Sequence, residues 1–229
     1  MKKAVMLGIG MASLLSGADA PLVVTPEKMR SVYEEVRTPC KLGMVLTPEA
    51  GEMLDNPTVF RHGDAWYMMF IRFDGKGYET HLAKSTDLLK WTRLGRIFSR
   101  GAEGQWDSAQ ADGWPALVDT RWEGPNTLNT FDGKYWMMYL GGALHGYETD
   151  PLSTGVAWTD DPSAVREWTR YEGNPVLRPS DPDAREFERR TIYKHFTVED
   201  PSRACGGRFV NFYNAKPQGA WRETAQYQW

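Results

Sequence analysis

The chain has 229 residues, of which 13% are aromatic and 25% are charged, and this is enough for one domain with a sizeable core. Lys and Arg number 27 against 30 Asp and Glu, so the net charge of -3 excludes a strongly basic surface of the kind that binds nucleic acid or an anionic membrane. Ten Trp and ten Tyr against two Cys indicate an aromatic-rich protein that does not rely on disulfides.

The N-terminus has three successive parts that are typical of a secretory signal peptide. Lys2 and Lys3 give a positive start, residues 4–15 form a short apolar run, and residues 18–20 (ADA) fit the small-x-small cleavage pattern. The run is too short to span a bilayer, and no other stretch of the sequence is apolar enough to do so. We therefore expect residues 1–20 to be a signal peptide and the protein to be secreted or periplasmic. A buried N-terminal helix is the alternative.

Residues 21–50 form an N-terminal segment that precedes the main domain. This segment contains Cys40, which lies far in sequence from the other cysteine, Cys205. Export would allow a disulfide, but neither cysteine belongs to a Cys-x-x-Cys or Cys/His cluster, so we expect both to be unpaired. The chain has no Gly-rich nucleotide cradle, zinc motif or nucleophile elbow, and we expect neither a metal site nor a cofactor.

A short aromatic strand, entered from a tight turn, recurs three times along residues 51–229. Its copies are residues 66–70 (WYMMF), 135–139 (YWMMY) and 209–213 (FVNFY). The second copy follows Asp132-Gly133, and Asp-Gly is among the strongest short hairpin signals because both residues accept positive φ. Each copy therefore predicts a strand linked to its neighbour by a hairpin.

Other features recur in the same order after each aromatic strand. Glu-Thr pairs begin at Glu79, Glu148 and Glu223, the first two within Gly-Tyr-Glu-Thr. The repeat length is about 70 residues, which exceeds the roughly 40–50 residues of WD40 or kelch blades. Antiparallel four-stranded units at a fixed period predict the blades of a β-propeller. The extra length predicts long loops on one face, where binding and catalysis usually occur.

The third copy of the repeat is short. Trp229 lies only a few residues after Glu223, where the other copies are still in their third strand. We therefore expect the chain to be a fragment with an unfinished third blade and open strand edges. A short chain that closes its propeller by oligomerising is the alternative.

Two segments carry a resemblance to a known group of enzymes. Residues 55–60 (DNPTVF) and residues 85–91 (STDLLKW) resemble blade segments of the five-bladed β-propeller glycoside hydrolases, the group that includes glycoside hydrolase family 43. The resemblance implies an all-β fold, a five-bladed β-propeller, of which residues 51–229 cover about the first three blades as a partial catalytic domain. The chain departs from the usual Asp-Pro start of a blade by one residue, Asn56.

Hydrolysis of a glycosidic bond needs one acid that protonates the leaving oxygen and one carboxylate that activates water or attacks carbon. In the resembling enzymes, three acids converge on the propeller axis from the innermost strands of the first three blades. The resemblance implies that these catalytic acids are Asp55, Asp119 and Glu188. Rival acids remain open in the second blade (Asp112, Glu123) and in the third (Glu186, Glu199).

The glutamate of each Glu-Thr pair recurs in every repeat, so we expect it to have a structural role, such as an inter-blade hydrogen bond. Aromatic and histidine side chains in or beside the long connections are candidates for stacking on and binding a sugar. They are Trp114, Trp122, His145, Tyr147 and His195. Packing beneath a loop is the alternative for the first four. His195, on the third inner strand, is either a reserve acid or a buried, hydrogen-bonded histidine.

These expectations favour an exported glycoside hydrolase that cleaves an oligo- or polysaccharide with carboxylates as acid and base. Two alternatives stay open. A glycoside phosphorylase would use Arg189 and Arg190, beside Glu188, to bind phosphate. A non-catalytic sugar-binding propeller would keep the fold without the reaction. In each case the partner is a carbohydrate, with no nucleic acid and no membrane span.

Overall fold

The computed structural model describes residues 24–37, 41–121 and 123–219. These belong to two compact units, Met1–Lys41 and Leu42–Trp229, and each is described by itself. The expected signal peptide, Cys40 and Trp122 lie outside the described residues. Cys205 is exposed and its thiol is free. No helix in the described ranges is long and apolar enough to cross a membrane.

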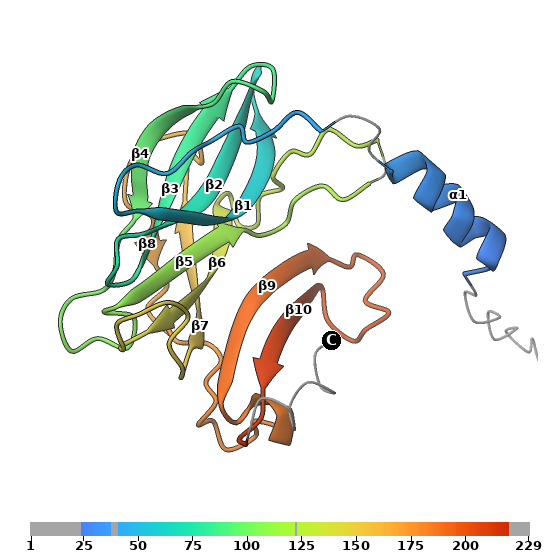
Figure 1. The fold of residues 1–229 in the computed structure, drawn as a ribbon. Helices are drawn as coiled ribbons and strands as arrows, with labels where there is room; N and C mark the ends of the chain where they lie inside the picture. The colour runs from blue at the N-terminus through green and yellow to red at the C-terminus, as the bar shows by residue number, and fades with distance from the viewer. Residues whose placement is uncertain (1–23, 38–40, 122, 220–229) are drawn as a thin grey trace, which may run out of the picture. The chain divides into compact units, whose positions relative to one another are not determined.

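The first unit contributes one helix, α1 (Pro26–Val36), which is blue in Figure 1. The Thr25 hydroxyl caps its N-terminus by accepting a hydrogen bond from the Lys28 backbone N–H at 3.2 Å. Arg30 and Glu34, one turn apart, form an ion pair at 2.8 Å. None of the residues of α1 is buried.

The second unit contains two four-stranded antiparallel sheets whose strands follow chain order (Figure 1). The first sheet comprises β1 (Met53–His62), β2 (Ala65–Phe73), β3 (Tyr78–Ser85) and β4 (Thr92–Phe98). The second comprises β5 (Gln110–Pro115), β6 (Tyr135–Gly142), β7 (Ser153–Thr159) and β8 (Thr169–Arg170). A single parallel pair, Tyr78 with Gln110, joins β3 to β5. Each sheet therefore has the strand order of one propeller blade.

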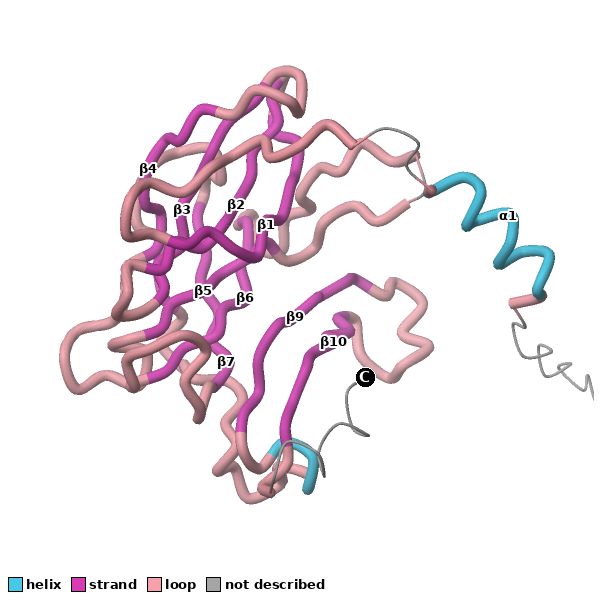
Figure 2. The backbone as a smooth tube through the Cα atoms, in the orientation of Figure 1, coloured by secondary structure: helices cyan, strands magenta, loops and turns pink. Residues whose placement is uncertain are grey.

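A third group of strands follows the two sheets (Figure 2). It consists of an antiparallel hairpin, β9 (Thr191–Glu199) and β10 (Phe209–Lys216), preceded by the short 3-10 helix η1 (Glu186–Glu188). β9 packs against β6 and β7. The three predicted aromatic strands lie in β2, β6 and β10, so the repeat and the all-β class are confirmed.

The predicted Asp-Gly turn leads into β6. φ is 53° at Asp132 and 67° at Gly133, the left-handed backbone that this turn requires. Phe131 and Lys134, on either side of it, exchange backbone hydrogen bonds at 3.0 and 3.1 Å. The turn thus determines where β6 begins.

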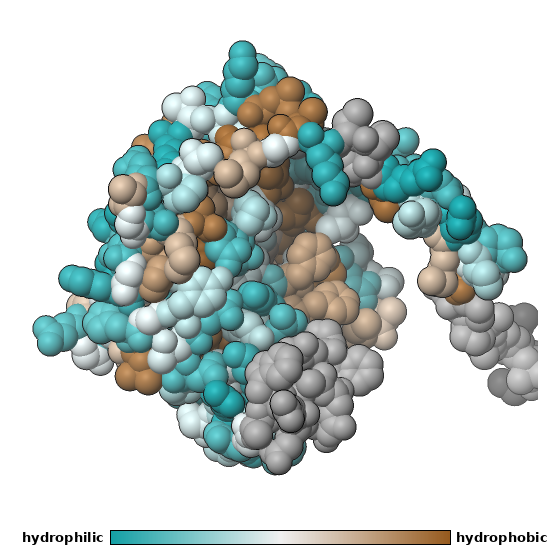
Figure 3. All heavy atoms as spheres, in the orientation of Figure 1, coloured by the Kyte–Doolittle hydropathy of each residue, from teal (hydrophilic) through white to brown (hydrophobic). Residues whose placement is uncertain are grey.

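Apolar side chains from both sheets form the main core. Phe60, Met69 and Leu82 of the first sheet pack with Met137 of β6 and with Trp168, which directly precedes β8, and all five are buried. Burial of each such side chain stabilises the fold by about 1.5–3 kcal/mol. On the face seen in Figure 3, polar side chains predominate and apolar side chains gather around a hollow.

The strand register shows that the two sheets have different second connections. Ile71 pairs with Thr80 in the first sheet, and Leu140 pairs with Thr154 at the same place in the second. Thr80 therefore corresponds to Thr154, and the matching Gly-Tyr-Glu-Thr sequences do not occupy equivalent positions. The second sheet has a longer loop, residues 143–152, between β6 and β7.

This difference separates the two glutamates of the repeat. Glu79 lies in β3, is buried, and forms an ion pair with Arg96 of β4 at 2.9 Å. Glu148 lies in the loop 143–152, where its φ is 45°. The expectation that these two glutamates have the same structural role is therefore wrong, because the loop in the second sheet moves its glutamate out of the strand.

Candidate active site

Two of the inner strands carry an irregularity at which a side chain is redirected. The β1–β2 register shifts between Asp55 and Thr58, and Asn56 has a φ of 53°. The β9–β10 register shifts opposite Lys194, which has a φ of 50°. β-bulges are over-represented beside active sites, and left-handed backbone at residues other than glycine is costly and concentrates at functional positions. The strands therefore mark Asn56 and Lys194 as candidate functional positions.

Asp55 contacts the long loop of the second sheet. Tyr147 Oη donates a hydrogen bond to Asp55 Oδ2 at 2.6 Å, and the Asn56 backbone N–H donates to Asp55 Oδ1 at 2.7 Å. The Tyr147 ring meets the rings of Phe73 and Tyr78 edge-on, with centroids 5.8 and 5.5 Å apart. The hydrogen bond to Asp55 is the largest cause that raises the pKa of Tyr147 to about 12, so the phenol stays protonated and keeps donating.

Asp112 of β5 lies beneath this contact and is only 2% exposed. Asn56 Nδ2 donates to both of its oxygens, at 3.1 and 3.0 Å. Burial raises the pKa of Asp112 to about 8, and the negative charges of Asp55 and Glu148 add to the rise, although the Asn56 hydrogen bonds oppose it. Asp112 is therefore largely protonated at neutral pH.

Glu148 brings a third carboxyl group to the same place. Its Oε1 lies 3.3 Å from Lys194 Nζ, and its backbone N–H donates to Tyr78 Oη at 2.9 Å. Partial burial acts to lower the pKa of Lys194, but the charges of Glu148 and Asp55 outweigh it and raise that pKa. Lys194 is therefore a charged ammonium group.

We call Asp55, Asp112, Glu148 and Lys194, with Asn56 and Tyr147, the carboxylate cluster. Asp55 and Tyr147 are exposed, Glu148 is half-buried and Asp112 is buried. The cluster offers two carboxyl groups that a ligand can reach, one neutral acid beneath them, and one cation. Such an arrangement can hold and transfer protons beside an exposed aromatic ring.

The structure places the other two sequence-predicted acids in local ion pairs. Asp119 accepts from Arg121, with 2.7 Å between Oδ2 and Nη2, and this bond lowers the pKa of Asp119. Glu188, in η1, pairs with Arg185 at 2.9 Å and accepts the Tyr213 hydroxyl. Burial opposes the ionisation of Glu188, but these bonds prevail and lower its pKa. Within the described ranges, the bonds of Asp119 and Glu188 go to these partners and not to the carboxylate cluster.

Two of the expected sugar-binding residues are buried against each other. Trp114 and His195 stack with ring centroids 5.8 Å apart, and Trp114 Nε1 donates to the His195 carbonyl. His195 Nε2 bonds Thr154 Oγ1 at 2.8 Å, and Asn211 Nδ2 donates to His195 Nδ1 at 3.1 Å. Burial lowers the pKa of His195 to about 3, so the ring is neutral. Both side chains join β9 to the second sheet, which is the buried alternative.

The remaining candidates differ in position. Tyr147 belongs to the carboxylate cluster, and His145 is exposed in the same loop. Sequence reasoning did not select Glu148, because it recurs in the repeat, or Lys194, for which no sequence signal exists. It named Asp112 only as a rival of Asp119. The greater length of the loop 143–152 was the one signal that pointed to Glu148.

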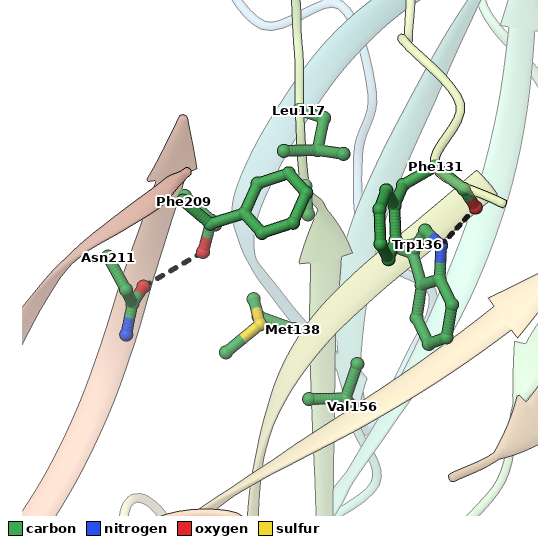
Figure 4. A pocket seen from close by; sticks show the side chains of 9 residues that line it. Leu117, Phe131, Trp136, Met138, Val156, Phe209 and Asn211 are labelled. Atoms are coloured by element: carbon green, nitrogen blue, oxygen red, sulfur yellow. Dashed lines mark hydrogen bonds between the residues drawn. The ribbon is translucent and has the colours of Figure 1, made fainter. Parts of the chain in front are cut away.

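A separate cavity of about 310 Å³ lies between the second sheet and the β9–β10 hairpin (Figure 4). Its lining consists of Ala116, Leu117, Phe131, Trp136, Met138, Val156, Thr197, Phe209 and Asn211. No charged side chain is among these described residues, and the Trp136 indole N–H is already bonded to the Phe131 carbonyl at 2.8 Å. The cavity therefore lacks the acids that bond cleavage needs, in contrast to the carboxylate cluster.

Comparison with protein-family models and with curated proteins finds no match. Two solved structures are similar to the chain. One, described as a complex of BT0996 with RGII, has 41% sequence identity and a TM-score of 0.82, with 86% of this chain and 58% of the solved protein covered. The other, described as a glycoside hydrolase, has 41% identity and a TM-score of 0.80, with 84% and 57% covered. The chain thus spans less than two thirds of either structure, and the resemblance to propeller glycoside hydrolases that its repeats predict is confirmed.

Proposed function

We propose that the protein containing this chain hydrolyses a glycosidic bond, with Asp55 and Glu148 as the two carboxyl groups that act on it. The carboxylate cluster is the observation that supports this proposal. It brings these two groups together from β1 and from the loop 143–152, beside the exposed ring of Tyr147. Glycoside hydrolysis needs two carboxyl groups with different protonation states, and an aromatic face on which the sugar rests.

Asp55 retains the role that the resemblance implied, that of general base or nucleophile. Two donors, the Tyr147 hydroxyl and the Asn56 backbone N–H, hold its carboxyl oxygens in position. Glu148 supplies the second group in place of Asp119 and Glu188, whose charges are satisfied by neighbouring arginines. Asp112 is too buried to reach a substrate and acts by holding Asn56, which shapes the turn that presents Asp55.

The proposed substrate follows from the similar structure that is described as a complex with RGII. We propose that this protein acts on a carbohydrate of that kind, outside the cytoplasm, after export directed by residues 1–20. The phosphorylase alternative has less support, because the arginines that would bind phosphate have internal partners. Arg190 pairs with Asp150 at 2.9 Å, and Arg189 donates to the Asp181 carbonyl at 3.1 Å.

The test is to incubate the protein with RGII and with a panel of synthetic glycosides, in the presence and absence of inorganic phosphate. We expect release of a free reducing sugar that is independent of phosphate. A sugar phosphate formed only with phosphate would favour the phosphorylase. Binding of the carbohydrate without any released sugar would contradict hydrolysis and favour a sugar-binding propeller.

A further inference from the structure

Among the described residues, Lys194 is the cation that pairs with a candidate acid of the carboxylate cluster, and its position is unusual. It stands on the third inner strand, where the resemblance placed an acid nearby. The register shift opposite Lys194 and its φ of 50° direct the side chain out of the strand pattern, while its neighbours Tyr193 and His195 are buried. A lysine held in left-handed backbone costs about 1 kcal/mol or more, so the fold must stabilise it by other contacts.

The contact that does so is the ion pair with Glu148, at 3.3 Å between Nζ and Oε1. Both residues have left-handed backbone, 50° at Lys194 and 45° at Glu148, and they come from elements far apart in sequence. Glu148 is fixed from its other side by its backbone N–H, which donates to Tyr78 Oη. Two locally strained segments thus meet through one charge pair.

The groups around Lys194 explain what the pair does. Glu148 and Asp55 are the negative groups near it, Asp112 is neutral because it is buried, and the Tyr193 ring lies with its centroid 5.7 Å from Nζ. An ammonium group at this distance favours the ionised form of a carboxyl group and fixes its direction. We propose that Lys194 is a positioning residue that holds Glu148 in place and sets the pH at which Glu148 gains or loses its proton. This inference rests on the proposed function of Glu148.

The first test compares Lys194→Met, Lys194→Arg and Glu148→Gln by their pH–rate profiles on the glycoside that the wild-type protein cleaves. We expect Lys194→Met to reduce kcat about 10- to 100-fold with little change in KM, because the loss is in the reacting geometry. A carboxyl group that loses a neighbouring cation titrates at higher pH, so one limb of the profile should move to higher pH whether Glu148 acts as acid or as base. Lys194→Arg, which keeps the charge, should restore much of the rate.

The double variant Lys194→Met/Glu148→Gln provides the second test. If Lys194 acts through Glu148, the second substitution should add almost nothing to the loss caused by Glu148→Gln. Full additivity of the two losses would overturn the inference while the proposed function stands. Lys90→Met, at an exposed lysine outside the cluster, is the matched control.

A third measurement does not depend on turnover. Carboxyl ¹³C NMR follows the titration of Glu148 in the wild-type protein and in Lys194→Met. We expect the midpoint of Glu148 to lie at higher pH in the variant, and an unchanged midpoint would overturn the inference. If this shift occurs but the wild-type protein cleaves no glycoside, the proposed function fails and the role of Lys194 on Glu148 is retained.

Discussion

Tyr147 donates a hydrogen bond to Asp55 from the loop of one sheet to the inner strand of the other, with 2.6 Å between Oη and Oδ2. The bond links the two blade-like units at the point where the candidate acids meet. Both side chains are exposed, so the bond does not serve the core. It orients Asp55 toward the space that a ligand can occupy.

Tyr147→Phe tests the importance of this bond. The variant keeps the ring contacts with Phe73 and Tyr78 and removes only the hydroxyl. A hydrogen bond to a charged group contributes about 1.5–3 kcal/mol, so we expect kcat/KM to fall roughly 10- to 100-fold, with stability changed by less than about 0.5 kcal/mol. Tyr171→Phe, at an equally exposed tyrosine (both are 49% exposed), should have no effect on turnover. Equal activity of Tyr147→Phe and wild-type protein would exclude a functional role for the bond.

Asp112 predicts how stability depends on pH. Its pKa is about 8 in the folded protein against an ordinary value of 3.8, so the folded state keeps a proton that the unfolded chain releases. Stability should therefore fall as the pH rises from about 4 to about 8, with a slope of up to ~1.4 kcal/mol per pH unit. In Asp112→Asn the side chain stays neutral in both states, and the slope should flatten. Urea unfolding at a series of pH values measures it.

The matched control for this slope is Asp119→Asn. The Arg121 hydrogen bonds lower the pKa of Asp119, so that carboxylate stays ionised across pH 5 to 8 and should not contribute to the slope there. A wild-type slope that persists in Asp112→Asn would show that Asp112 is ionised in the folded protein at neutral pH.

His195 distinguishes packing from sugar binding. His195→Ala removes the stack on Trp114 and the bonds to Thr154 and Asn211. We expect the free energy of unfolding to fall by about 2–4 kcal/mol, because a large buried side chain is lost and two polar partners are left unpaired. His145→Ala, at an exposed histidine, should cost less than about 0.5 kcal/mol. Unchanged stability of His195→Ala together with lost sugar affinity would support the binding role instead.

Local signals in the sequence predicted the strands well. The aromatic runs of β2, β6 and β10 and the turn at Asp132-Gly133 depend only on neighbouring residues, and the structure has them where the repeat predicts. The order of four strands in each of the two complete sheets follows from the same repeat.

The site was harder to predict, because its residues meet through long-range contacts. Asn56 interrupts the expected Asp-Pro start, and that departure is the bulge that directs Asp55 and reaches Asp112. Glu148 was assigned a structural role because the motif around it recurs, whereas the register shows that the loop displaces it from the strand. Asp119 has an arginine two residues later, and this local signal already favours an ion pair over a catalytic role.

The central claim is that Asp55 and Glu148, rather than Asp119 and Glu188, act on the glycosidic bond. Turnover of one glycoside by four variants, Asp55→Asn, Glu148→Gln, Asp119→Asn and Glu188→Gln, tests it most directly, with unfolding curves to confirm that each variant folds. We expect the first two to lose at least about 100-fold in kcat, as removal of an acid or base does, and the last two to keep near-normal turnover when folded. Normal turnover in Asp55→Asn or Glu148→Gln, or complete loss in a folded Asp119→Asn or Glu188→Gln, would contradict the assignment.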